Sequence, residues 1–182
     1  MFVRVFLLSA IVLSLVFSCK EDETDCVPLT FYIDSVQLIA DIAIIDQYLS
    51  DSSIVAIEHE SGLRYVIHAE GDGLPIQSCT GVSANYSGYF LDGTYFDSSI
   101  EAVAREKGVF NVKRNYAPFN FIVDQDFVIG GWHEGFKLLS KGTKATLYIP
   151  SSLGYGADGY LPAIPPDSQL IFDVEVVDTY TP

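Results

Sequence analysis

The stretch FNFIVDQDFVIGGW, residues 119–132, decides the fold of this chain. Phe119, Phe121 and Val123 alternate along it, which is the period of a half-buried strand. The two glycines that follow let the main chain turn closely at the start of a helical pattern over residues 132–139. The only tryptophan, Trp132, therefore stands at a helix start, where it can form the floor of a concavity. By residue type alone, a large aromatic is more often plain core packing.

The composition around this stretch is that of a folded protein. The chain has 182 residues, of which 49% are hydrophobic and 13% aromatic, enough for one domain with a sizeable core plus an appendage. Its formal net charge of -14 repels phosphate backbones and anionic lipid headgroups, so nucleic acid is a poor partner. The three histidines are scattered and the three cysteines lack CxxC spacing, so the sequence predicts neither a metal site nor a cofactor.

Upstream, residues 36–50 carry apolar side chains at helical spacing. Leu38, Ile42, Ile45 and Leu49 share one face, and Asp34 stands where an N-terminal cap is expected. A helix of this length needs tertiary packing to be stable. The sequence leaves two alternatives open, a helix that packs on its own domain and a helix that serves as a spacer or for dimerisation.

Short strand patterns recur on both sides of the central stretch. Period-2 or apolar runs cover residues 55–60, 63–68, 82–90, 145–150 and 172–177, and Leu91-Asp-Gly93 after the third run is a hairpin signal. Several short strands, one central helix and one closing strand predict an α+β domain in which an antiparallel sheet wraps around a helix.

Three further segments point to a family. Residues 86–99 precede the central stretch, whereas residues 153–159 and 164–178 follow it. In this order the four motifs resemble the FKBP-type peptidyl-prolyl cis-trans isomerases, and the likeness covers about residues 62–178. The resemblance implies an FKBP-like antiparallel β-sheet wrapped around one short helix, here with an additional N-terminal amphipathic helix.

The resemblance also implies a site. The prolyl ring of a substrate would sit over Trp132, Tyr155 would donate its hydroxyl to a substrate carbonyl, and Asp97 would orient polar groups at the rim. The walls of the pocket would be Tyr86, Phe96, Phe119, Val128, Ile129, Ile164 and Phe172, and the backbone N-H of Ile129 would bind a second carbonyl. By type alone, each of these aromatic residues is more often core.

Some positions depart from the family pattern. Tyr160 and Leu161 stand where many members have histidine and proline, and Gly130 stands where a basic residue is common. These differences lie mostly at the mouth, so we expect them to change sequence preference rather than abolish turnover. We expect His133 to be a surface residue of the helix start.

Where members of the family usually have only a few residues, this chain has residues 100–117, so the resemblance implies an insertion of about a dozen residues at the rim of the site. Residues 101–107 fit a helical turn, and Val109, Phe110 and Val112 fit a strand. Loops of this length are more often functional or mobile than idle. Because the insertion changes the rim of the site, the substrate preference of this chain does not follow from that of the family.

The N-terminus predicts export. Residues 5–17 form an apolar run that is too short to span a bilayer but suits a secretory signal, and Val16-Phe-Ser-Cys19 resembles a bacterial lipoprotein processing site. Lipidation at Cys19 would hold the protein in the cell envelope, on the outer membrane at its periplasmic or surface face. Ordinary signal cleavage is the alternative.

We therefore divide the chain into a lipoprotein signal peptide (1–18), a tether (19–33), an N-terminal helical segment and linker (34–61) and an FKBP-type isomerase domain (62–182). In an oxidising compartment, Cys26 and Cys79 are either a disulfide that ties the tether to the domain or two unpaired thiols.

The expected activity is isomerisation of X-Pro bonds, which would assist the folding of exported or envelope proteins. The alternative is a non-catalytic or weakly active chaperone that binds peptides in the same pocket. Proline-containing polypeptides are the expected partners, and macrolides such as rapamycin are expected ligands. The membrane is reached only through the lipid anchor, and the sequence does not decide the oligomeric state.

Overall fold

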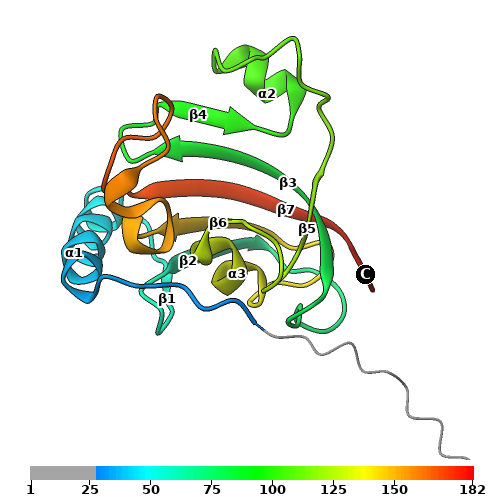
Figure 1. Cartoon of the computed structure of the whole chain (residues 1–182), viewed down its shortest axis with the longest axis horizontal. Coiled ribbons are helices and arrows are strands. Elements are labelled where there is room, and N and C mark those ends of the chain that lie inside the picture. The colour runs from blue at the N-terminus through cyan, green and yellow to red at the C-terminus, as the bar shows by residue number, and fades with distance from the viewer. Residues whose placement is uncertain (1–27) are drawn as a thin grey trace, which may run out of the picture.

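A computed structural model of the chain describes residues 28–182, and one seven-stranded antiparallel sheet organises them (Figure 1). The strand order is β1-β2-β6-β7-β3-β4, and β5 pairs with β3. The strands are β1 (Ile57–Glu58), β2 (Arg64–Ala69), β3 (Gly81–Phe90), β4 (Tyr95–Ser98), β5 (Phe119–Ile122), β6 (Lys144–Ile149) and β7 (Leu170–Tyr180). The helices are α1 (Ser35–Asp51), α2 (Glu101–Glu106) and α3 (Gly130–Phe136), with two 3-10 turns, η1 (Ser151–Leu153) and η2 (Gly156–Asp158).

The closing strand β7 lies in the middle of the sheet, between β6 and β3. Phe172 is opposite Leu147 of β6 and Gly88 of β3. Alternation sends Phe172 and Val174 to one face, which we call the inner face, and sends the residues between them to the outer face. The predicted antiparallel sheet around one short helix is confirmed.

Helix α3 lies on the inner face of the sheet (Figure 1). A Cβ atom at Gly131 would collide with the side chain of Ile149 in β6, so only glycine allows this close approach. The approach buries Trp132 and Phe136 against the sheet. Of the two glycines before the tryptophan, the second, Gly131, is therefore the one whose backbone packs closely against a neighbour, as the sequence predicted.

Helix α1 packs against the outer face. The Asp34 carboxylate caps it by accepting the backbone N-H groups of Val36 and Gln37 at 2.9 and 3.1 Å. Ile45 and Leu49 are buried against Tyr148 and Ile171, two outward-facing sheet residues. Of the two alternatives for this helix, the structure shows packing on its own domain.

Polar contacts tie α1 down as well. Asp41 is fully buried and accepts hydrogen bonds from Ser151 Oγ at 2.6 Å, Gln169 Nε2 at 2.6 Å and Gln37 Nε2 at 2.9 Å. Because Ser151 belongs to η1, this carboxylate connects the helix to the long loop between β6 and β7.

The insertion differs in part from the prediction. Helix α2 forms where a helical turn was expected, but residues 109–112 form no strand. The guanidinium of Arg105 lies 3.5 Å from the ring centre of Phe110, and that ring stacks on Tyr116 at 5.5 Å. Phe110 and Tyr116 thus pack locally, whereas Val112 is 83% exposed, and no strand among residues 28–182 pairs with residues 109–112. Strand β1 is likewise shorter than residues 55–60.

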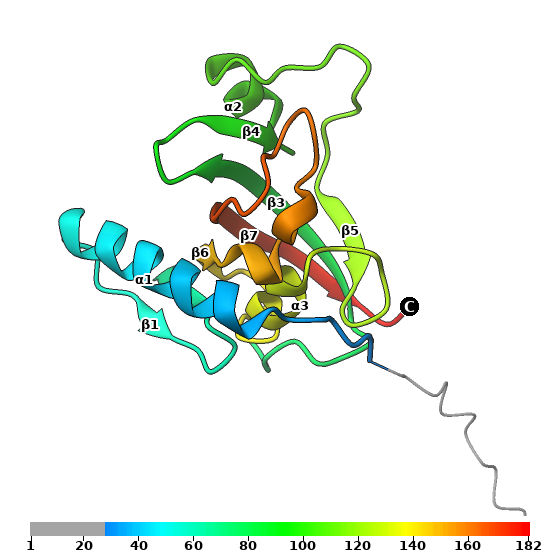
Figure 2. The same ribbon diagram turned by 60° about the vertical axis from the view of Figure 1, so that its left-hand side comes forward.

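The predicted signal peptide, the lipidation site Cys19 and Cys26 lie outside the described residues. The last residues of the predicted tether, 28–33, lie along the domain on their way to α1 (Figure 2). Leu29 N-H donates to the backbone carbonyl of Asp124 at 3.0 Å. Cys79 is disulfide-bonded, and its pairing with Cys26 stays a prediction. Within residues 28–182, no helix has the length and apolarity needed to cross a membrane.

Candidate active site

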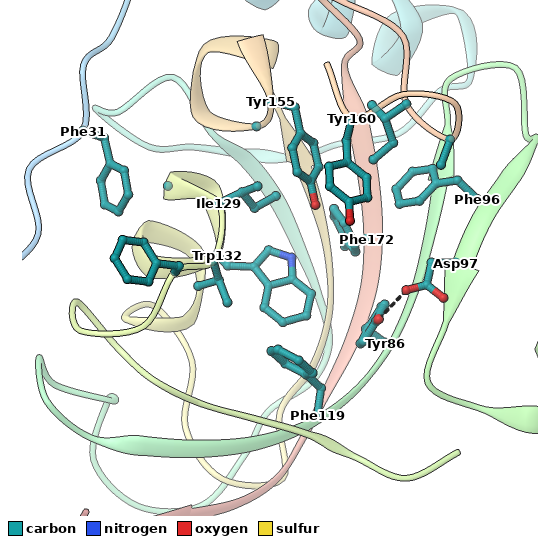
Figure 3. A pocket seen from close by; sticks show the side chains of 16 residues that line it. Phe31, Tyr86, Phe96, Asp97, Phe119, Ile129, Trp132, Tyr155, Tyr160 and Phe172 are labelled. Atoms are coloured by element: carbon teal, nitrogen blue, oxygen red, sulfur yellow. Dashed lines mark hydrogen bonds between the residues drawn. The ribbon is translucent and has the colours of Figure 1, made fainter. Parts of the chain in front are cut away.

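An open cavity of about 660 Å³ lies between α3, the inner face of the sheet and the loop after β6 (Figure 3). All ten side chains predicted for the site line this one cavity. They are Tyr86, Phe96, Asp97, Phe119, Val128, Ile129, Trp132, Tyr155, Ile164 and Phe172. The structure thus brings together residues from β3, β4, β5, the turn between β5 and α3, α3 itself, the loop after β6, and β7.

Trp132 forms the floor of the cavity. Its ring meets three others edge-to-face, with centroids 5.1 Å from Tyr86, 5.4 Å from Phe172 and 5.7 Å from Phe119. Such edge contacts are favourable for aromatic rings and hold the indole in one orientation. The indole N-H is buried and has no hydrogen-bond partner among residues 28–182. The cavity therefore has an aromatic base, whose unpaired indole N-H is itself shielded from solvent.

A polar corner stands opposite this floor. The Tyr86 hydroxyl donates to Asp97 Oδ2 at 2.5 Å, as the dashed line in Figure 3 marks. Arg114 pairs with Asp97 Oδ1 and also donates to the Tyr86 hydroxyl at 2.9 Å. Burial, and then the hydrogen bond to Asp97, raises the pKa of Tyr86 to about 12. Tyr86 thus stays protonated, and its hydrogen bond helps to fix the position of the carboxylate.

Arg114 was missed by sequence reasoning. It belongs to the insertion, 17 residues after Asp97, and only the fold brings the two together. The sequence did indicate a basic partner for Asp97 near the rim, because four of the ten basic residues of this acidic chain fall within residues 100–117. They are Arg105, Lys107, Lys113 and Arg114.

The loop after β6 supplies two hydroxyls at the mouth. Tyr155 and Tyr160 lie with ring centres 5.4 Å apart. Burial, with smaller contributions from Tyr160 and Asp97, raises the pKa of Tyr155, so its hydroxyl is a protonated donor at neutral pH. Backbone hydrogen bonds between Tyr160 and Ile164, at 2.7 and 2.9 Å, hold this loop over the cavity.

Ile129 contributes both its side chain and its backbone. It precedes the first helical residue of α3, and within residues 28–182 its N-H makes no hydrogen bond. The first N-H groups of a helix have no partner inside the helix, so they can bind an external acceptor. A substrate carbonyl is an acceptor of this kind.

The expectation that His133 lies on the surface is wrong. Its side chain is fully buried. Nδ1 accepts the Asp124 backbone N-H at 2.9 Å, and the ring of Phe31 stacks on the imidazole with ring centroids 5.2 Å apart. Burial lowers the pKa of His133, although Asp124 acts in the opposite direction. Phe31 also lines the cavity, together with Phe127, and neither residue was predicted.

Comparisons with known proteins identify the family of this chain. The family described as FKBP-type peptidyl-prolyl cis-trans isomerase matches residues 75–177. The chain is 43% identical over 119 residues to a probable isomerase of this type from Haemophilus influenzae, which covers 65% of this chain and 43% of the relative. It is 39% identical over 118 residues to Escherichia coli FkpA, covering 65% of this chain and 38% of that protein.

A solved structure is similar as well. The crystal structure of FkpA from Escherichia coli matches with a TM-score of 0.61 at 32% identity, covering 80% of this chain and 62% of the other. The chain spans about two fifths of the length of the curated relatives described above. The range 75–177 contains all ten predicted cavity residues, whereas Phe31 precedes it.

Proposed function

Because the chain belongs to the FKBP-type peptidyl-prolyl cis-trans isomerase family, we propose that it catalyses cis-trans isomerisation of X-Pro bonds in other polypeptides. The observation that carries the proposal is the open aromatic cavity over Trp132, which joins the polar corner at Tyr86 and Asp97 to the hydroxyl of Tyr155.

The chemistry explains why such a cavity suffices. Rotation about the bond has a barrier of about 18 to 20 kcal/mol because the amide must lose resonance, and no proton has to move. A million-fold acceleration requires about 8 kcal/mol of preferential binding of the twisted amide. A water-poor apolar pocket and a few positioned donors favour that twisted state.

Each predicted residue then has a role. The prolyl ring lies on Trp132 between Phe96 and Phe172, and the hydroxyl of Tyr155 binds one substrate carbonyl. The free N-H of Ile129 binds a second carbonyl. Asp97, fixed by Tyr86 and Arg114, sets the electrostatic field at the rim where the amide rotates. Tyr86, Phe119, Val128 and Ile164 complete the apolar wall.

A weakly active binding module is the second candidate. Phe127 and Tyr160 line the cavity and expose large apolar surfaces, and solvent-exposed apolar patches of this kind often bind other chains. In this function the cavity would hold unfolded segments without accelerating rotation. Macrolides such as rapamycin are proposed ligands of the cavity in both cases.

The substrates are proposed to be exported or envelope proteins. This rests on sequence alone, on the apolar run at residues 5–17 and the processing motif that ends at Cys19. A lipid on Cys19 would leave the isomerase domain facing the compartment in which such proteins fold.

An isomerisation assay on a proline-containing tetrapeptide tests the activity. The purified protein should accelerate the cis-trans exchange, and Asp97→Val should lower kcat/KM by about tenfold or more, because a positioned charge at a reacting group typically contributes at least that much. Glu106→Val is the matched control, because this carboxylate is exposed and pairs with neighbouring Lys107, away from the cavity.

Circular dichroism must show that both variants keep the native fold. A wild-type rate equal to that of buffer, with the peptide still bound, would leave the binding module as the function. Equal rates for Asp97→Val and wild type would remove Asp97 from the mechanism.

A further inference from the structure

The insertion after β4 differs in charge from the rest of the protein. Residues 100–117 contain four basic and two acidic residues, hence two net positive charges, whereas the whole chain carries -14. Helix α2 and the segment after it stand beyond β4, which is an edge strand of the sheet (Figure 1). The insertion is therefore a positively charged region at one edge of an acidic protein.

Lys113 is the only Lys or Arg side chain among residues 28–182 that has no carboxylate partner. The other seven each form at least one ion pair, and three of these, Arg105, Lys107 and Arg114, belong to the insertion. Lys113 is exposed to solvent. Its ammonium group can therefore bind an external anion without first breaking an internal ion pair.

The backbone around Lys113 is held by a turn. The Lys113 N-H donates to Asn111 Oδ1 at 2.9 Å, and the Arg114 N-H donates to the Asn111 carbonyl at 3.0 Å. The Asn111 N-H in turn donates to the Tyr116 hydroxyl at 2.8 Å, and the Tyr116 ring stacks on Phe110. A charge on an ordered turn binds a ligand at a lower entropy cost than the same charge on a segment that must first be ordered.

Arg114 attaches this turn to the rim of the cavity. It pairs with Asp97 and donates to the Tyr86 hydroxyl at 2.9 Å, and both of these residues line the cavity. Consecutive Cα atoms are about 3.8 Å apart, and an extended peptide advances by about 3.3 Å per residue. A peptide whose proline occupies the cavity can therefore bring a residue a few positions away to the turn that carries Lys113.

We propose that Lys113 is a specificity-determining residue, which binds an aspartate or glutamate side chain about two to four residues away from the substrate proline. The negative charge of the rest of the protein opposes an acidic peptide only weakly, because physiological salt screens exposed charges beyond about 8 Å. A carboxylate beside Lys113 lies within that distance, so the local attraction decides the preference. The inference rests on the proposed function.

The test uses peptides in which one position, about two to four residues before or after the proline, is glutamate, glutamine or lysine. For at least one position, the wild type should prefer glutamate over glutamine by about threefold in kcat/KM at physiological salt, as an exposed ion pair allows. Salt at about 1 M should abolish this preference. Lys113→Glu should reverse it in favour of lysine, whereas Lys113→Arg should keep it. Both variants should turn over the glutamine peptide at the wild-type rate, because Lys113 does not line the cavity.

Lys107→Glu is the matched control, because it changes the charge of the insertion by the same amount at a lysine that already pairs with Glu106 at 2.8 Å. It should keep the wild-type preference for glutamate. The proposal would be overturned if no position showed that preference, if Lys113→Glu left it intact, or if Lys107→Glu removed it equally. If the wild type binds the peptides without isomerising them, the same ratios are measured as Kd from Trp132 fluorescence, and only the proposed catalysis fails.

Discussion

The two faces of the sheet show what distinguishes a packed surface from a binding surface. On the outer face, the part of β6 and β7 next to α1 is closed by Ile45 and Leu49, and the part beyond it carries Lys144, Asp173 and Glu175. On the inner face, the part beyond α3 carries aromatic rings. The uncovered outer surface is polar and suited to water, whereas the uncovered inner surface is suited to an apolar ligand.

Helix length explains why the inner face stays open. With a rise of 1.5 Å per residue, the seven residues of α3 are about 10 Å long and the seventeen of α1 about 25 Å. Strand β7, with eleven residues, extends over about 35 Å. The short helix therefore covers only part of the inner face, and the cavity lies where coverage ends.

The largest effect should come from breaking the outer packing. Ile45→Ala removes a fully buried side chain, so the free energy of unfolding should fall by about 3 kcal/mol. The kcat/KM of the folded fraction should stay at the wild-type value, because Ile45 does not line the cavity. Urea denaturation and the peptide assay measure the two quantities.

The neighbouring Ile44 is the control for this prediction. It is 46% exposed, so Ile44→Ala should change stability by less than about 1 kcal/mol. Similar losses for the two variants would mean that α1 does not pack on the sheet through Ile45.

A smaller loss should follow when the buried carboxylate of α1 is neutralised. Asp41→Asn keeps the size of the side chain but turns an amide N-H₂ toward donors on Ser151, Gln169 and Gln37. We expect a loss of about 2 kcal/mol in urea denaturation. Asp51→Asn, at an exposed residue that accepts one bond from Gln47, should be nearly neutral. Equal effects of the two changes would show that burial of Asp41 contributes little.

The smallest expected effect is on the pH dependence of stability, through His133 of helix α3 on the inner face. Burial lowers the pKa of His133 below its ordinary value of 6.5, so below about pH 6.5 the unfolded chain binds more protons than the folded one. Stability is then fully present above that pH and falls on acidification, with a limiting slope of about 1.4 kcal/mol per pH unit. Nearby Asp124 and Glu134 oppose the shift, whereas Lys137 adds to it.

Thermal melts between pH 8 and pH 5 measure this contribution. His133→Gln should flatten the acid limb of the stability curve relative to wild type, and the two curves should be parallel above pH 7.5. An unchanged acid limb in the variant would assign the pH dependence to other groups.

Local patterns were enough for most of the fold. Alternation in residues 119–123 and 172–177 depends only on the period of a strand, and the cap at Asp34 depends only on neighbouring backbone N-H groups. The ten residues were found because motifs at four places in the chain resembled one family. Their roles in catalysis remain predictions.

The sequence by itself determined most of the strands and helices, because they follow from short-range periodicity. The resemblance of its four motifs to one family indicated which residues converge on Trp132. Only the tertiary structure decided that Arg114 pairs with Asp97, that Phe31 covers His133 and lines the cavity, and that residues 109–112 form no strand. Each of these depends on which distant segments meet, and a contact between distant segments leaves no period in the chain.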